Sequence, residues 1–339
     1  QRQMCIRDST YTYNDRSEVI SDSLGSGRSY SYHYDNMGNR TTSLEHGNMV
    51  IYVTNPLNQY TSVRPHVIIN SIPDAAPASL PGEFFPEYDA DGNETLVKTA
   101  TGIWTVAYNA QNQATAFTKD TKRIECVYDY LNRRVEKTVY DGNTLVSRKR
   151  FIYVGYLQVA ELDATNETET ASPILRKTYL WDPMESVATR ILAMSVFDEA
   201  GVYQEDLYYT HDLLKNTTAL FGIQGGRRAL YEYSPYGDII KMEGNAAEIN
   251  PFRFSSEYLD DDLGLVYYNY RYYNVLDGRW INRDPMAENA GFNLYCFVSN
   301  KLSIDYLGLI ELDNVLKQLK ERLEKKARAE AQQRCIAFC

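Results

Sequence analysis

The chain has 339 residues, with 35 basic and 45 acidic side chains and a formal net charge of −10. This acidic balance disfavours a nucleic-acid-binding surface, so we expect no nucleic acid among its partners. The five cysteines are scattered, which excludes a disulfide framework or a cysteine-based zinc site. No stretch is long and apolar enough to predict a transmembrane segment. The 29 tyrosines against 11 phenylalanines are typical of half-buried strand faces.

The first nine residues, QRQMCIRDS, are set apart from the fold. They back-translate to CAG AGA CAG ATG TGT ATA AGA GAC AGY, which is similar to the transposon adapter of sequencing libraries. We therefore expect residues 1–9 to be a sequencing artefact. We also expect the chain from residue 10 onward to be a fragment of a longer protein that lacks its true N-terminus.

A short unit recurs in residues 10–249: Tyr, then Asp or Asn, two variable residues, and Gly or Asn. Copies lie at residues 34–39, 88–93, 108–113 and 128–133, and the last three are spaced by about 20 residues. A related segment, Asn55-Pro56-Leu57-Asn58-Gln59-Tyr60, follows Tyr52. Asp, Asn and Gly accept the positive φ of tight turns, and Asx side chains bond their own backbone. Two strands and two turns fill this period, so the pattern predicts hairpins stacked into a curved antiparallel sheet.

Two segments depart from the repeat. Residues 65–86 contain Pro65, Pro73, Pro77, Pro81 and Pro86, which predicts an irregular insertion. Residues 310–339 are a variable tail in which apolar side chains recur at helical spacing, at Leu312, Val315, Leu316, Leu319 and Leu323. Acidic residues begin this pattern and basic ones end it, which complements the helix dipole. We predict an amphipathic helix from Glu311 to about Gln333, docked on the sheet or on a partner.

The tyrosine-rich stretch 266–273 is the centre of the sequence. Read as one strand, it places Val266, Tyr268, Tyr270 and Tyr272 on one face and Tyr267, Asn269, Arg271 and Tyr273 on the other. Asp277-Gly278 then predicts a tight turn, after which Trp280 and Ile281 resume an apolar strand.

This stretch resembles the core-domain signature of RHS-repeat (YD-repeat) proteins over residues 250–309. The resemblance is carried by Gly264-Leu265, Tyr267-Tyr268, Arg271-Tyr272-Tyr273, Gly278-Arg279-Trp280, Arg283-Asp284-Pro285, Asn293-Leu294-Tyr295 and Gly308-Leu309. Lys301 and Tyr306 stand where proline is typical. The family resemblance implies an all-β fold, in which repeat hairpins wind into a curved sheet or partial hollow shell that the core signature closes.

The resemblance also implies a candidate site. Cores of this family resemble self-processing aspartic proteases, which maps the catalytic pair to Asp284 and Asp305 and the cut to the bond after Leu309. The chemistry needs two carboxylates close enough to share a proton, one as base on water and the other as acid. Arg283 is a candidate to orient one carboxylate by a charge-assisted hydrogen bond. The structural alternative is that Asp284 opens a turn and Asp305 caps one.

No cofactor and no metal are expected. We interpret Asp260-Asp261-Asp262 as a solvated turn, because a calcium loop has oxygen ligands at alternate positions and more of them nearby. The four histidines are dispersed and show neither a catalytic nor a metal spacing.

Two functional hypotheses remain open. In the first, which the resemblance implies, the chain is the C-terminal part of a secreted bacterial polymorphic-toxin shell that encloses a variable C-terminal cargo, its partner, and releases it by self-cleavage. In the second, it is a non-catalytic structural or adhesive repeat protein of the cell surface that binds carbohydrate or surface proteins. A cut after Leu309 that depends on both aspartates discriminates between them.

Overall fold

The computed structural model describes residues 9–24, 27–45, 47–65, 82–168, 171–184, 190–289, 291–301 and 303–311. The predicted all-β fold class is confirmed in these residues. Their helical segments are three single 3₁₀ turns, η1 (Phe254–Ser256), η2 (Ala287–Asn289) and η3 (Val298–Asn300). The predicted C-terminal helix lies outside the described residues except for its first residue, Glu311, which is in a strand.

Two antiparallel meanders form most of the molecule. The first sheet has six strands in chain order: β1 (Ser9–Tyr13), β2 (Val19–Leu24), β3 (Ser29–Tyr34), β4 (Arg40–Glu45), β5 (Asn48–Thr54) and β6 (Tyr60–Pro65). The second sheet has 14 strands: β7 (Glu87–Tyr88), β8 (Glu94–Thr99), β9 (Gly102–Tyr108), β10 (Ala114–Lys119), β11 (Lys122–Tyr128), β12 (Arg134–Asp141), β13 (Thr144–Val154), β14 (Leu157–Asp163), β15 (Ile174–Trp181), β16 (Ile191–Phe197), β17 (Tyr203–His211), β18 (Thr217–Gly222), β19 (Arg227–Tyr233) and β20 (Ile239–Glu243). Between the sheets, Phe84 forms an isolated bridge with Val63.

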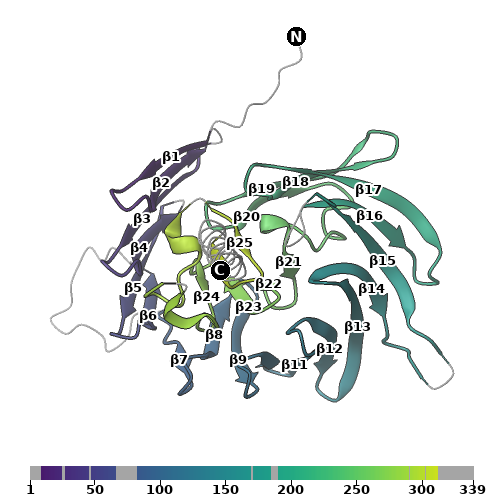
Figure 1. Cartoon of the computed structure of the whole chain (residues 1–339), viewed down its shortest axis with the longest axis horizontal. Coiled ribbons are helices and arrows are strands. Elements are labelled where there is room, and N and C mark those ends of the chain that lie inside the picture. Colours follow the sequence, from purple (N-terminus) through teal and green to yellow (C-terminus); the bar gives the residue numbers. More distant parts are fainter. Residues whose placement is uncertain are drawn as a thin grey trace, which may run out of the picture.

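Two smaller sheets follow. One has the strands β21 (Tyr258–Asp260), β22 (Leu265–Tyr268), β23 (Arg271–Asn274) and β24 (Arg279–Trp280), and the other pairs β25 (Asp305–Tyr306) with β26 (Ile310–Glu311). Figure 1 shows the two meanders curving around the small sheet β21–β24, which lies on their concave side. We call β21–β24 and the segments that follow it to residue 311 the plug.

The repeat turns share one hydrogen-bonding pattern. In the turn at residues 35–39, Asp35 Oδ1 accepts hydrogen bonds from the backbone N–H groups of Met37 at 2.8 Å and Asn39 at 2.9 Å. The fourth residue, Gly38, has a φ of 77°. The same bonds form at Asn55, Asp89, Asn109 and Asp129, the other predicted turns. Because an Asx side chain replaces backbone partners in the turn, the local sequence suffices to form it.

The tyrosine of the repeat connects neighbouring units. Tyr108 donates its hydroxyl proton to the carbonyl of Glu94 at 2.9 Å, and Tyr128 does the same to Ala114 at 2.8 Å. Each acceptor is the first residue of a strand in the preceding repeat. A partly buried ring with a bonded hydroxyl explains why tyrosine, and not phenylalanine, stands at these two positions.

The concave face of the large sheet packs on the plug. Alternate residues of each strand point inward, such as Trp104 and Val106 in β9. They form one buried cluster with plug residues that include Tyr258, Tyr267 and Tyr272. A second cluster lies within the plug around Tyr268, Tyr273, Trp280 and Phe297. Buried apolar area of this kind is the main stabilising contribution to the fold.

The prediction of a single strand over residues 266–273 is wrong. The stretch is a hairpin: Val266 pairs with Tyr273 and Tyr267 with Tyr272, across a turn at Asn269 and Tyr270. Directly paired residues of a hairpin share a face of the sheet. Across a two-residue turn, an odd-numbered residue pairs with an even-numbered one, so the two faces differ from those of a continuous strand. Tyr267 and Tyr272 therefore lie in the sheet-facing cluster, while Tyr268 and Tyr273 lie in the plug's own cluster. The predicted turn at Asp277-Gly278 is confirmed, with a φ of 64° at Gly278.

Candidate active site

Asp284 and Asp305 come from separate segments of the plug and lie on one buried arginine. Arg271, in β23, places its Nη2 atom 2.8 Å from Asp284 Oδ2 and 3.6 Å from Asp305 Oδ2. The Arg271 guanidinium also stacks over Trp280, with its carbon 4.1 Å from the ring centroid. The structure thus brings the two predicted aspartates together, although Pro285 to Ile304 separate them in the sequence.

Each aspartate also begins a turn and accepts hydrogen bonds from backbone N–H groups within it. The Asp284 N–H donates to the Leu294 carbonyl at 2.9 Å, and Asp284 Oδ1 accepts from the Met286 N–H at 2.8 Å. Asp305 Oδ1 accepts hydrogen bonds from the N–H groups of Gly308 at 3.0 Å and Leu309 at 3.1 Å. The carboxyl group of Asp305 is therefore bonded to the residue that precedes the predicted cut.

The residues that precede the predicted scissile bond, Leu307 and Gly308, lie closely against β22 and β23. The Tyr270 N–H donates to the Leu307 carbonyl at 3.0 Å, and Arg271 Nε donates to the Gly308 carbonyl. Gly308 has a φ of 72°, and an added Cβ there would lie 3.0 Å from Tyr268 Cβ. Glycine is required here both by the backbone conformation and by the close approach of β22.

Burial dominates the electrostatics of the pair. It raises the pKa of Asp305 to about 7; Arg271 and the two amides oppose this rise, and Asp284 adds to it. Burial also raises the pKa of Asp284, with Arg271 opposing. One positive guanidinium between two buried carboxyl groups favours one ionised and one protonated carboxyl, because two negative charges there are not fully compensated. This is the protonation state that a base and an acid need.

A cavity of about 270 Å³ adjoins the pair. Its lining combines both aspartates and Arg271 with residues of the first sheet's turns, among them Arg16, Glu18 and Gly38. Polar groups converging on a concave site are typical of a binding or active site. The first sheet thus contributes one carboxyl group, that of Glu18, to the lining of this cavity. The plug contributes the other two, those of Asp284 and Asp305.

Arg283 does not lie between the aspartates. Its side chain is exposed and lies over Gly92, where an added Cβ would be 2.5 Å from Arg283 Cδ. The arginine in contact with both carboxylates is Arg271, which the sequence reasoning did not single out as a site residue. The sequence signal that could have identified Arg271 is its position within the tyrosine run, because a charged side chain buried among aromatic rings needs a partner of opposite charge.

The interpretation of Asp260-Asp261-Asp262 as a solvated turn holds for Asp261, which lies in a turn with its side chain 59% exposed, but is wrong for its two neighbours. Asp260 is 0% exposed and pairs with Arg134 at 2.7 Å and with Lys137. Asp262 pairs with Lys122 at 2.8 Å and with Lys137 at 2.9 Å. These cations belong to β11 and β12, so no local pattern could reveal them.

Two further observations concern the described residues alone. Within them, no three His, Cys, Asp or Glu side chains gather in a geometry that could hold a metal ion. No helix among them is long and apolar enough to cross a membrane.

The chain is similar to known proteins in its sequence and in its fold. No protein-family model matches the chain. Double-stranded DNA deaminase toxin A of Burkholderia cenocepacia is 28% identical over 240 residues, or 66% of this chain and 17% of that protein. The tRNA3(Ser)-specific nuclease WapA of Bacillus spizizenii is 24% identical over 290 residues, or 83% of this chain and 11% of that protein.

Among solved structures, the crystal structure of TcdB2-TccC3 without its hypervariable C-terminal region matches 90% of this chain with a TM-score of 0.58 and 16% identity. The match covers 17% of that chain. This chain therefore spans less than a fifth of the length of each of these proteins. The two relatives are named as a DNA deaminase toxin and a tRNA nuclease. The fold of this chain is similar to that of the matched part of TcdB2-TccC3.

Proposed function

We propose that the chain is the C-terminal part of a secreted bacterial RHS-type toxin shell, and that it cuts itself after Leu309 to release the segment that follows. The fold shared with TcdB2-TccC3 and the toxin and nuclease relatives support this assignment. The Tyr-Asp repeat turns and the core signature support it independently. The cargo would begin at Ile310, since a hypervariable C-terminal region is named for TcdB2-TccC3.

One observation carries the proposal. Asp305 accepts hydrogen bonds from the N–H groups of Gly308 and Leu309 while sharing Arg271 with Asp284. The two carboxyl groups and the segment that ends in the predicted scissile bond are thus parts of one buried arrangement. A turn that needed only a cap would be satisfied by Asp305 alone, with no second buried carboxyl group beside it.

The reaction is hydrolysis of the peptide bond between Leu309 and Ile310. Asp284, the nearer carboxylate to Arg271, is ionised and takes a proton from a water molecule as the oxygen attacks the Leu309 carbonyl carbon. Asp305 supplies its proton to the leaving nitrogen of Ile310 as the carbon–nitrogen bond breaks. The products are a new carboxyl group on Leu309 and a new amino group on Ile310. The cavity beside the pair has room for the attacking water molecule, and burial of the two carboxyl groups strengthens their electrostatic interactions.

The test is an intact-mass measurement on the purified chain and on two variants, Asp284→Asn and Asp305→Asn. We expect the parent chain to lose the fragment that begins at Ile310 and both variants to stay whole. Asp198→Asn is the matched control, because Asp198 caps a repeat turn outside the plug and asparagine keeps the acceptor oxygen that it uses there. A folded parent that stays whole would reject self-cleavage and favour the non-catalytic surface protein.

A further inference from the structure

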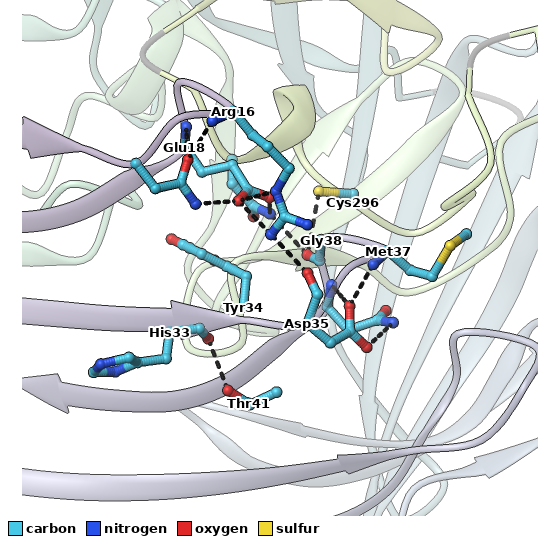
Figure 2. A network of polar contacts seen from close by, with 12 residues as sticks. Arg16, Glu18, His33, Tyr34, Asp35, Met37, Gly38, Thr41 and Cys296 are labelled. Atoms are coloured by element: carbon cyan, nitrogen blue, oxygen red, sulfur yellow. Dashed lines mark hydrogen bonds and ion pairs between the residues drawn. The ribbon is translucent and has the colours of Figure 1, made fainter.

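The two turns nearest the N-terminus reach the plug beside the aspartate pair. They span residues 14–18 and 35–39 and are bonded to each other: Arg16 Nη2 donates to the Asp35 carbonyl at 2.7 Å. The same nitrogen is 2.7 Å from Glu18 Oε2. Figure 2 shows Arg16 and Glu18 of the first turn next to Asp35 and Gly38 of the second, with Cys296 of the plug beside Gly38.

Asn300 connects these turns to the Asp305 side of the site. Its Nδ2 atom donates to the Gly38 carbonyl at 2.7 Å and lies 3.4 Å from Glu18 Oε1. Asn300 is 4% exposed, so its amide depends on these partners. The fit is close, because an added Cβ at Gly38 would lie 3.3 Å from Asn300 Nδ2. The chain then runs from Asn300 to Asp305 in a few residues.

Asn293 connects the second turn to the Asp284 side. Its Nδ2 atom donates to the Met37 carbonyl at 3.0 Å and to Asn39 Oδ1 at 2.8 Å. The next residue, Leu294, accepts at its carbonyl a hydrogen bond from the Asp284 N–H at 2.9 Å and one from Arg271 Nη1 at 3.4 Å. Each aspartate is therefore connected to the turns of the first sheet through a nearby asparagine, Asp284 through Asn293 and Asp305 through Asn300.

We propose that residues 14–18 and 35–39 form a clamp that holds residues 291–301 of the plug and so places Asp305 opposite Asp284. Asn293 and Asn300 are its positioning residues. Self-cleavage then requires the first sheet to be folded and docked, which delays release until the shell wall around the plug is built. This inference rests on the proposed self-cleavage, but the contacts it describes can be tested without it.

The first experiment follows cleavage by intact mass after the full chain is refolded from urea. Asn300→Asp keeps the size of the side chain but replaces the donor with a carboxylate that faces the Gly38 carbonyl and Glu18. We expect cleavage to slow at least tenfold. We also expect cleavage to decline at a lower pH than in the parent, because a displaced Asp305 is better hydrated and loses its proton earlier. Arg271, Asp284 and Glu257 are the charged groups that act on Asp305.

A double variant and a control separate positioning from general damage. Glu18→Gln with Asn300→Asp exchanges the amide and the carboxyl across the same contact, so we expect it to recover at least a third of the parental rate. Asn300→Gly and Asn132→Gly form a matched pair, since both asparagines have positive φ values, 58° and 63°. Asn132 bonds to Gln113 in the large sheet, so its variant should cleave at the parental rate.

The second experiment is independent of cleavage. Hydrogen exchange of the Gly308 and Leu309 amides, which donate to Asp305, is measured in the uncut Asp284→Asn background. We expect Asn300→Asp to accelerate exchange severalfold and the double variant to restore it. If exchange changes in this way but the parent chain does not cleave, the clamp is supported and the proposed function is rejected. Parental exchange in Asn300→Asp, or parental cleavage with an unchanged pH profile, would overturn the clamp.

Discussion

Arg134 and Asp260 form an ion pair at 2.7 Å that joins the large sheet to the plug, with side chains 1% and 0% exposed. The same guanidinium stacks over Tyr267 at 4.5 Å and donates to the Tyr272 hydroxyl at 3.1 Å. Burial opposes the ionisation of Asp260, yet Lys137 and Arg134 hold its pKa below the usual range. The pair therefore fixes the plug at one place on the concave face, because either charge alone would be buried without compensation.

Asp260→Asn should destabilise the chain by about 3–5 kcal/mol, the range measured when one partner of a buried ion pair is removed. The loss arises because Arg134 and Lys137 would keep their charges in a buried site. The measurement is the urea midpoint of unfolding, followed by tyrosine fluorescence.

Asp261→Asn is the control within the same acidic run. Asp261 pairs with Arg253 at 2.9 Å, but its side chain is 59% exposed. Arg253 is only 4% exposed, but it keeps its hydrogen bonds to the carbonyls of Asn250 and Ala247. We therefore expect a smaller loss than for Asp260→Asn, about 1–2 kcal/mol. Equal midpoints for the two variants would mean that the Arg134–Asp260 pair does not anchor the plug.

Asp89→Ala tests the repeat turn. Asp89 Oδ1 accepts from the N–H groups of Asp91 at 3.0 Å and Asn93 at 2.8 Å, which hold the turn between β7 and β8. Alanine leaves both donors without these acceptors, so we expect a loss of about 1–2 kcal/mol, similar to the loss of a helix cap. Asp89→Asn keeps the acceptor oxygen and should stay near the parent. Asp91→Ala, in the same turn but exposed, should change the urea midpoint little.

The repeat turns could be predicted because their determinants are local. An Asx side chain at the first position and a residue tolerant of positive φ at the fourth are enough, and both are visible in the sequence. Similar turns at Asn14, Asp198 and Asp212 were missed. Asp198 and Asp212 follow Phe197 and His211, so the search for a preceding tyrosine passed over them.

The plug could be predicted only in part, because its structure depends on long-range contacts. The turn at Asn269 and Tyr270 has no glycine to mark it, so the tyrosine run was interpreted as a single strand. The cations that neutralise Asp260 and Asp262 come from strands more than 120 residues earlier. The sequence signature singled out Asp284 and Asp305, but their shared contact with Arg271 follows from how β23 packs.

The raised pKa of Asp305 predicts a pH dependence of stability. An unfolded aspartate titrates near 4, whereas burial raises the pKa of folded Asp305 to about 7. Between these values the folded chain binds more protons than the unfolded chain, so this group's contribution to stability is greatest at low pH and falls as pH rises through 7. The slope is at most about 1.4 kcal/mol per pH unit.

The check is a series of urea midpoints between pH 4 and 8 for uncut Asp284→Asn, with and without Asp305→Asn. The double variant should lose this component of the slope, because asparagine does not titrate. Because Asp284 adds to the raised pKa of Asp305 and is absent in this background, parallel profiles would show that burial alone does not raise that pKa. Cleavage in the parent should likewise decline above pH 7, where the proposed acid loses its proton.

Gly308→Ala tests whether the segment before the cut must lie against β22. The residue needs a φ of 72°, and its Cβ would lie 3.0 Å from Tyr268 Cβ and 3.3 Å from the Arg271 backbone nitrogen. Both neighbours are part of packed strands, so the segment should shift, and Leu309 should lose its place relative to Asp305. We expect at least a hundredfold slower cleavage by intact mass, with a loss of about 1–3 kcal/mol in stability.

Gly225→Ala separates the backbone requirement from the contact. Gly225 has a φ of 80° but no atom within 4 Å of an added Cβ, so it imposes the same conformational cost with no clash. It should lose about 1–2 kcal/mol and cleave at the parental rate. If Gly308→Ala also cleaved at the parental rate, the close contact with Tyr268 would have no part in placing the scissile bond, and Asp305 would be left as the cap of a turn.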